Sequence, residues 1–151
     1  MNPETPVSQI MTTKLVTVES DSRLQKVRQI FEQHGFHHIP VMEFGKLVGI
    51  ISKSDFFHMH YHGSQKPALN GNAGDDVNYI ARDIMTEYPM HLDSDDTVGL
   101  AADIFLANRF HALPVVDNGE LVGIVTSHDL IAYAFGSMVN DEMMVEDFSD
   151  I

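Results

Sequence analysis

Residues 36–57 read FHHIPVMEFGKLVGIISKSDFF, and residues 110–131 read FHALPVVDNGELVGIVTSHDLI. The second stretch lies 74 positions after the first, and the register extends back without a gap, so that residues 10–57 align with residues 84–131. Both copies open on Ile-Met-Thr and share a Pro-Val pair, a Gly-x-Leu-Val-Gly-Ile run and a late aspartate. Because self-similarity at a fixed period is typical of repeat architectures, one folding unit is predicted to occur twice.

The first helix of each copy is indicated by its apolar spacing. Apolar residues recur on one helical face after Leu24 in the first copy and after Val98 in the second, as in an amphipathic helix. Serine and aspartate side chains at residues 20–22 and 94–96 are expected to cap these helices at their N-termini.

Three short strands and a last helix complete each copy. The strands are predicted at residues 15–18, 38–42 and 47–52 in the first copy and at residues 90–92, 112–116 and 121–126 in the second. The Asn118-Gly119 pair is typical of a tight hairpin turn. The last helix is expected to open at residues 54–55 and 128–129. The predicted fold class is therefore α/β (α+β), with two βαββα units.

One such unit is too small to bury a stable core alone, whereas two units packed sheet to sheet share one. We expect a first repeat at residues 7–62 and a second at residues 80–136. Residues 63–79 are rich in Gly, Asn and Asp, which is typical of a linker. Residues 137–151 form an acidic tail, which we expect to be a partly ordered helix.

Composition excludes several classes of function. The 151 residues include 9 Lys+Arg and 22 Asp+Glu, for a net charge of −13. This balance argues against binding nucleic acid or an anionic membrane surface. The chain has no cysteine, which excludes disulfides and thiol catalysis. It shows neither a signal segment nor an apolar run of spanning length, so we expect a cytoplasmic protein.

The duplicated pattern resembles a tandem pair of cystathionine β-synthase domains, known as a CBS pair or Bateman module. Four marks carry the resemblance in both copies, over residues 7–135: the Ile-Met-Thr opening, His-x-(Ile/Leu)-Pro-Val, Gly-x-Leu-Val-Gly-Ile and (Ser/Thr)-x-x-Asp. The resemblance implies a pseudo-twofold CBS pair that forms a homodimer. It also implies clefts between the repeats for AMP, ADP, ATP or S-adenosylmethionine, and a regulatory role toward a protein that the sequence does not identify.

Two aspartates are the candidate ribose ligands. Asp55 and Asp129 match the family's ribose-binding aspartate, and one carboxylate can accept hydrogen bonds from both hydroxyls of a ribose diol. The alternative is that each aspartate only caps its helix.

Candidate phosphate ligands lie where strands pass into helices. Ser52, Ser54 and Thr126 supply hydroxyls near free backbone N–H groups, and helix capping is again the alternative. His128 stands where the first copy has Ser54, so the two copies should differ in their preference for anions.

The resemblance places further basic side chains near the phosphates. His37, His38 and His111 precede the proline-containing strands, and a protonated histidine binds anions; the alternative is an ordinary core or surface histidine. Lys53 is the fixed cation expected near a site.

Thr17 and His91 hold equivalent positions in the first strands and are candidate contacts for the base or ribose. With so few cations, ATP would need Mg²⁺, and AMP or S-adenosylmethionine suits the acidic chain better. No cofactor beyond such a ligand is required.

The sequence also bears on three other functions. The chain has no P-loop, GxGxxG, GxSxG or HExxH motif, so an enzyme is not expected and no catalytic residue is assigned. His58-x-His60-x-His62 has the spacing of metal ligands but lacks a fourth ligand. The main alternative to a sensor is a dimerisation or protein-interaction module that binds no ligand.

Overall fold

The computed structural model describes residues 1–58 and 79–139. The first repeat comprises η1 (Val7–Gln9), β1 (Val18–Glu19), α1 (Leu24–Gln33), β2 (His38–Glu43), β3 (Lys46–Ser52) and α2 (Lys53–His58). The second comprises α3 (Ala81–Ile84), β4 (Thr86–Glu87), α4 (Val98–Ala107), β5 (Ala112–Asp117), β6 (Glu120–Thr126) and α5 (Ser127–Val139). The predicted order of helices and hairpins is confirmed. Residues 63–78 of the predicted linker lie outside the described residues, and so does the predicted tail beyond residue 139.

The two hairpins have the same register. In β2–β3, Val41 pairs with Gly49 and the register then shifts at Met42; in β5–β6, Val115 pairs with Gly123 and the same shift follows. The predicted Asn118-Gly119 turn is confirmed, with φ of 51° and 81°. Both values lie in the left-handed region that a tight hairpin turn needs.

The first strands are shorter than predicted. Of residues 15–18 only Val18 is in a strand, and β1 pairs in parallel with β2. In the second repeat, Leu92 makes a single parallel bridge to Val115, and its N–H donates to the carbonyl of Pro114 (2.9 Å). This single bridge satisfies the backbone of Leu92, so a longer strand does not form there.

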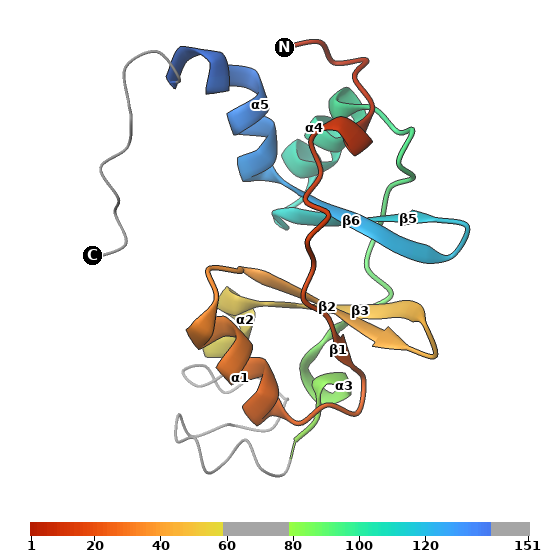
Figure 1. The fold of residues 1–151 in the computed structure, drawn as a ribbon, viewed down its shortest axis with the longest axis vertical. Coiled ribbons are helices and arrows are strands. Elements are labelled where there is room, and N and C mark those ends of the chain that lie inside the picture. The colour runs from red at the N-terminus through yellow and green to blue at the C-terminus, as the bar shows by residue number, and fades with distance from the viewer. Residues whose placement is uncertain (59–78, 140–151) are drawn as a thin grey trace.

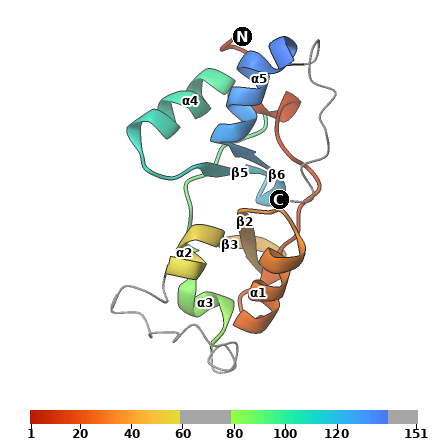
Figure 2. The same ribbon diagram turned by 90° about the vertical axis from the view of Figure 1, so that its left-hand side faces the viewer.

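The hairpins lie at the centre of the molecule and the helices lie outside them. Figure 1 shows β2–β3 and β5–β6 one above the other, with α1, α2 and α3 below and α4 and α5 above. Figure 2, turned by 90°, shows the same two layers. The two lobes are therefore packed sheet to sheet, as predicted, and β3 faces β6.

The opening segment of each repeat packs into the opposite lobe. Val7 is buried in the core formed by α4, β5 and β6, with Ile10 and Met11 against it. Ile84 and Met85 are buried in the core formed by α1, β2, β3 and α2. Figure 1 shows the crossing, where the red N-terminal segment descends past β6 and the green α3 lies beside α1. The two repeats are thus intertwined.

The predicted capping of α1 and α4 is wrong. The Ser20 hydroxyl contacts Glu43 and Arg82 instead, and Arg23 precedes α1 without a side-chain cap. The Leu24 N–H donates to the carbonyl of Tyr79 (3.0 Å), so backbone that directly precedes the second repeat satisfies the start of α1.

At α4, the side chain that caps the helix is Thr97, whose Oγ1 accepts from the N–H of Leu100 (3.1 Å). Asp96, inside the predicted capping range, instead closes a turn by accepting from the N–H of Asp93 (2.8 Å).

Candidate functional site

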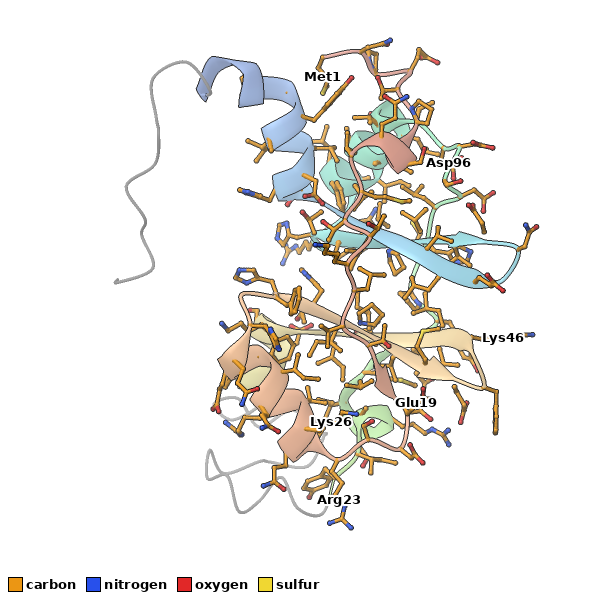
Figure 3. The ribbon with its side chains drawn as sticks, viewed as in Figure 1. Met1, Glu19, Arg23, Lys26, Lys46 and Asp96 are labelled. Carbon is orange, nitrogen blue, oxygen red and sulfur yellow. The ribbon has the colours of Figure 1, made fainter. Side chains whose placement is uncertain are left out.

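A cavity of about 920 Å³ lies between the two lobes. Its lining comes from both repeats: Gly35, His37, His38, Ile50, Ser52, Ser54, Asp55, Thr86, Glu87, Tyr88, Pro89, Met90, Arg109, Phe110, His111, Ala112, Thr126, Ser127 and His128. Side chains of both hairpins occupy much of the layer between the sheets, whereas the labelled Arg23, Lys26 and Lys46 lie at the outer surface (Figure 3). A ligand in this cavity would contact both repeats at once.

Eight of the twelve predicted site residues line this cavity. They are His37, His38, Ser52, Ser54, Asp55, His111, Thr126 and His128. The other four do not line it: Thr17 is exposed before β1, His91 is exposed before the Leu92 bridge, Lys53 begins α2, and Asp129 is half-buried in α5. Three pairs of equivalent predicted residues line the cavity together, namely His37 and His111, Ser52 and Thr126, and Ser54 and His128, whereas Asp55 lines it and its equivalent Asp129 does not.

Residues 86–90 form a wall of the cavity that the sequence analysis missed. β4 pairs with β3 through Thr86 and Ile50, and Tyr88, Pro89 and Met90 follow along the rim. Tyr88 has φ of 45°, a left-handed conformation that is unusual for a bulky residue. The repeated Met-Thr motif precedes this wall, but only the crossing of the chain brings the wall to the first repeat.

Arg109 lines the cavity, whereas Lys53, the fixed cation that the sequence predicted near a site, does not line it. Residue 109 directly precedes the Phe-His motif and is equivalent to Gly35 in the first repeat. Among the described lining residues, Arg109 is the only arginine or lysine, and Asp55 and Glu87 are the only carboxylates. Four histidines, His37, His38, His111 and His128, line the same cavity.

The two candidate ribose ligands, Asp55 and Asp129, differ in their hydrogen bonds and in their exposure. Asp129 Oδ2 accepts from the N–H of Thr126 (2.8 Å), and the Asp129 N–H donates to Thr126 Oγ1 (3.1 Å). This reciprocal pair is a capping box. In the first repeat the Asp55 N–H donates to Ser52 Oγ (3.0 Å), and the Asp55 residue is exposed at the cavity. The capping alternative thus describes Asp129 better than Asp55.

The same hydrogen bonds explain where the last helices begin. Ser52 and Thr126 act as N-caps, so α2 begins at Lys53 and α5 at Ser127, one residue before the predicted starts. Hydroxyl side chains are good N-caps because they accept from the unpaired N–H groups of the first turn.

His38 is half-buried at the centre of the histidine cluster. Burial of its imidazole is the main cause that lowers the pKa of His38 from 6.5 to about 4, and the neighbouring His37 and His111 lower it further. The Asp55 carboxylate raises it. At neutral pH the His38 ring is therefore uncharged.

This shift predicts a loss of stability in acid. The pKa of His38 is about 4 in the folded chain and 6.5 ordinarily, so between these values the unfolded chain binds more protons and stability falls as the pH is lowered. We expect the melting temperature to fall over this range less in His38→Gln than in the native chain. Equal pH profiles for the two proteins, followed by circular dichroism, would contradict this.

The described residues offer no metal site or membrane-spanning helix. In residues 1–58 and 79–139 no three His, Asp or Glu side chains are grouped to hold a metal ion, and no helix there is long and apolar enough to cross a bilayer. The predicted metal alternative at His58, His60 and His62 lies outside this finding, because residues 60 and 62 and the side chain of His58 are not described.

Comparison with known families accounts for the duplication. The profile of the CBS domain matches residues 7–60 and again residues 81–136. The chain belongs to the CBS domain family. Its two CBS domains form a tandem pair, as the repeated motifs predicted, and the cavity lies between them.

Several CBS proteins are similar to this pair. The uncharacterized protein MJ1404 of Methanocaldococcus jannaschii is 32% identical over 142 residues, covering 93% of this chain and 30% of that protein. The chain spans less than half the length of the first curated relatives that it matches.

Two solved CBS pairs carry adenosine compounds. That of protein MJ0100, in complex with 5′-methylthioadenosine and S-adenosyl-L-methionine, is 29% identical with a TM-score of 0.70, covering 90% of this chain and 99% of that one. Arabidopsis thaliana CBSX2, in complex with AMP, is 23% identical with a TM-score of 0.72, covering 88% of this chain and 98% of that one. At this lower identity the likeness to CBSX2 shows the fold.

Proposed function

We propose that this CBS pair is a regulatory module, without catalytic activity of its own, that binds one adenosine-containing ligand in the cavity between its repeats. The observation that carries the proposal is the exposed Asp55 in a cavity that both repeats line. The similar pairs solved with AMP, or with 5′-methylthioadenosine and S-adenosylmethionine, support this ligand class.

The chemistry of the lining suits the three parts of such a ligand. The Asp55 carboxylate can accept from both hydroxyls of a ribose diol. Ile50, Pro89 and Met90 offer apolar surface for a purine, in keeping with the mostly apolar linings of ligand sites. A phosphate or other anionic end would lie toward Arg109, His111 and the residues at the start of α5, where Thr126 and Ser127 supply hydroxyl groups.

We infer one ligand per chain, because the second half of the pseudo-twofold pair lacks the same features. Its aspartate, Asp129, accepts a backbone hydrogen bond in the capping box. Residues 12–16, which are equivalent to the 86–90 wall, are not part of the cavity lining. A ligand there would have to compete with a formed cap.

Arg109 is the only fixed cation among the lining residues that the structure describes. A ligand with a single phosphate, or a cationic adenosyl compound, therefore matches the site better than a bare triphosphate. ATP would need Mg²⁺ to offset its charge. Thr17, Lys53 and His91 do not line the cavity, and we assign them no contact with the ligand.

Regulation would follow from the position of the ligand. Because it would contact both lobes, a ligand that binds one arrangement of the lobes more tightly shifts the population toward that arrangement. The module would act as a homodimer, and a partner protein would bind the surface that this shift changes. A module that dimerises or binds a partner without any ligand is the second candidate.

The test compares two matched aspartate variants by calorimetric titration with AMP, ADP, ATP with and without Mg²⁺, and S-adenosylmethionine. Loss of charge-assisted bonds in Asp55→Asn should weaken binding by about 10- to 100-fold. Asp129→Asn should keep its affinity and lose thermal stability. Binding lost in Asp129→Asn and kept in Asp55→Asn would overturn the assignment, and no binding by any ligand would favour the interaction module.

A further inference from the structure

The cavity brings together four histidines, two from each repeat. His37 and His38 begin the first hairpin, His111 precedes the second, and His128 lies in the first turn of α5. His37 and His111 are both close enough to His38 to affect its protonation. Four of the nine histidines of the chain thus line the cavity in which a ligand would contact both repeats.

The surroundings of His38 contain groups of both signs. His37 directly precedes it, and His111 of the second repeat and Asp55 of α2 are close enough to affect its protonation. Arg109 and His128 complete the basic part of the same lining, and Glu87 adds one further carboxylate. A phosphate entering this cluster would meet mainly imidazoles, in a chain whose net charge is −13.

An imidazole binds an anion more tightly when it is protonated. The neutral ring has one N–H donor and one acceptor nitrogen, whereas the imidazolium has two donors and a positive charge. Hydrogen bonds between an ionised donor and an ionised acceptor are roughly twice as strong as neutral ones. The affinity of this cluster for phosphate therefore depends on protons.

Building on the proposed function, we propose that the His37, His38, His111 and His128 cluster makes nucleotide binding a proton-coupled event. Binding of a phosphate-bearing adenosine ligand takes up protons, so that its affinity rises as the pH falls. Binding of adenosine, which carries no phosphate, is insensitive to pH. The site then responds to the acidity of its surroundings as well as to the ligand concentration.

The direction of the effect follows from linkage. Without ligand the pKa of His38 is about 4. A phosphate beside the ring favours the imidazolium and raises this pKa, so the complex holds more protons than the separate molecules do. Affinity is therefore lost as the pH rises through the pKa of the complex, by at most about tenfold per pH unit for each proton taken up.

The experiment is calorimetric titration of the native chain with AMP and with adenosine, over the range from about pH 5 to 8, which begins above the pKa of about 4 that His38 has without ligand. Two buffers of different ionisation enthalpy report proton uptake directly. We expect AMP to bind about three- to tenfold more tightly for each unit of acidification, with heats that depend on the buffer. Adenosine should show neither effect.

Two histidine variants separate the cluster from the titration of AMP itself. His38→Gln should lose most of the pH dependence. His34→Gln is the matched control, since His34 stacks on Phe36 at a ring distance of 5.3 Å and does not line the cavity, and it should keep the dependence. Ligand binding without proton uptake, or an unchanged pH response in His38→Gln, would overturn the coupling and leave the proposed function standing. Failure of adenosine, AMP, ADP, ATP and S-adenosylmethionine all to bind would overturn both the coupling and the proposed function.

Discussion

Replacing Gly49 with valine is expected to lower the free energy of unfolding by about 2–3 kcal/mol, which is the upper range for overpacking in a core. Gly49 lies in the middle of β3, between Val41 on one side and Glu87 on the other. A β-carbon at this position would lie 2.7 Å from the γ-carbon and 3.0 Å from the β-carbon of Met85, and would also overlap its sulfur. The β-carbon of Met85 cannot move away without moving the backbone of the crossing segment.

Gly123→Val should behave in the same way in the other lobe. There a β-carbon would lie 2.9 Å from the γ-carbon of Met11 and 3.2 Å from the carbonyl oxygen of Thr12. The measurement is urea unfolding of both variants by circular dichroism. Gly136→Ala is the control, because a β-carbon there meets nothing within 4 Å and alanine favours helix. Midpoints for the two valine variants that equal those of the native chain would show that the methionines repack freely.

These contacts also explain which parts of the fold the sequence predicts. The Ile-Met-Thr and Leu-Val-Gly-Ile motifs are visible as repeats, and their hydrophobic patterns suffice to predict the hairpins and the first helices. The spacing does not reveal that Met85 packs on Gly49, and Met11 on Gly123. A contact between the opening of one repeat and the hairpin of the other is non-local, and local propensity carries no information about it.

The residues of the candidate site likewise fall into those that a local motif places and those that a non-local contact places. Ser52, Asp55 and His111 belong to local strand-to-helix or loop-to-strand motifs, so their placement at the cavity follows from the motif. The 86–90 wall reaches the cavity through the pairing of β4 with β3, which a single repeat does not contain. The difference between Asp55 and Asp129 depends on hydrogen-bond geometry and is invisible in two identical (Ser/Thr)-x-x-Asp motifs.

Cutting the chain between residues 68 and 69 is expected to give two fragments that are unfolded alone and fold when mixed. Fragment 1–68 lacks Ala81, Ile84 and Met85, which are buried in its core. Fragment 69–151 lacks Val7, which is completely buried, and the Ile10 and Met11 side chains that pack around it. It also loses the pairing of Thr12 with Ile124. A unit of this size is marginal even when its core is complete.

Each fragment carries the segment that the other one needs, so association restores both cores together. We expect little ordered circular dichroism from either fragment and a cooperative thermal transition from the equimolar mixture, whose mass by light scattering is that of both fragments combined. Fragment 1–68 with Ile10→Asp is the matched control. This aspartate would face the apolar core of the other fragment, where an unpaired charge is unfavourable, so association should weaken. A cooperative transition in fragment 1–68 alone would show that the first repeat does not depend on the crossing segment, and that the intertwining is not what holds the two lobes together.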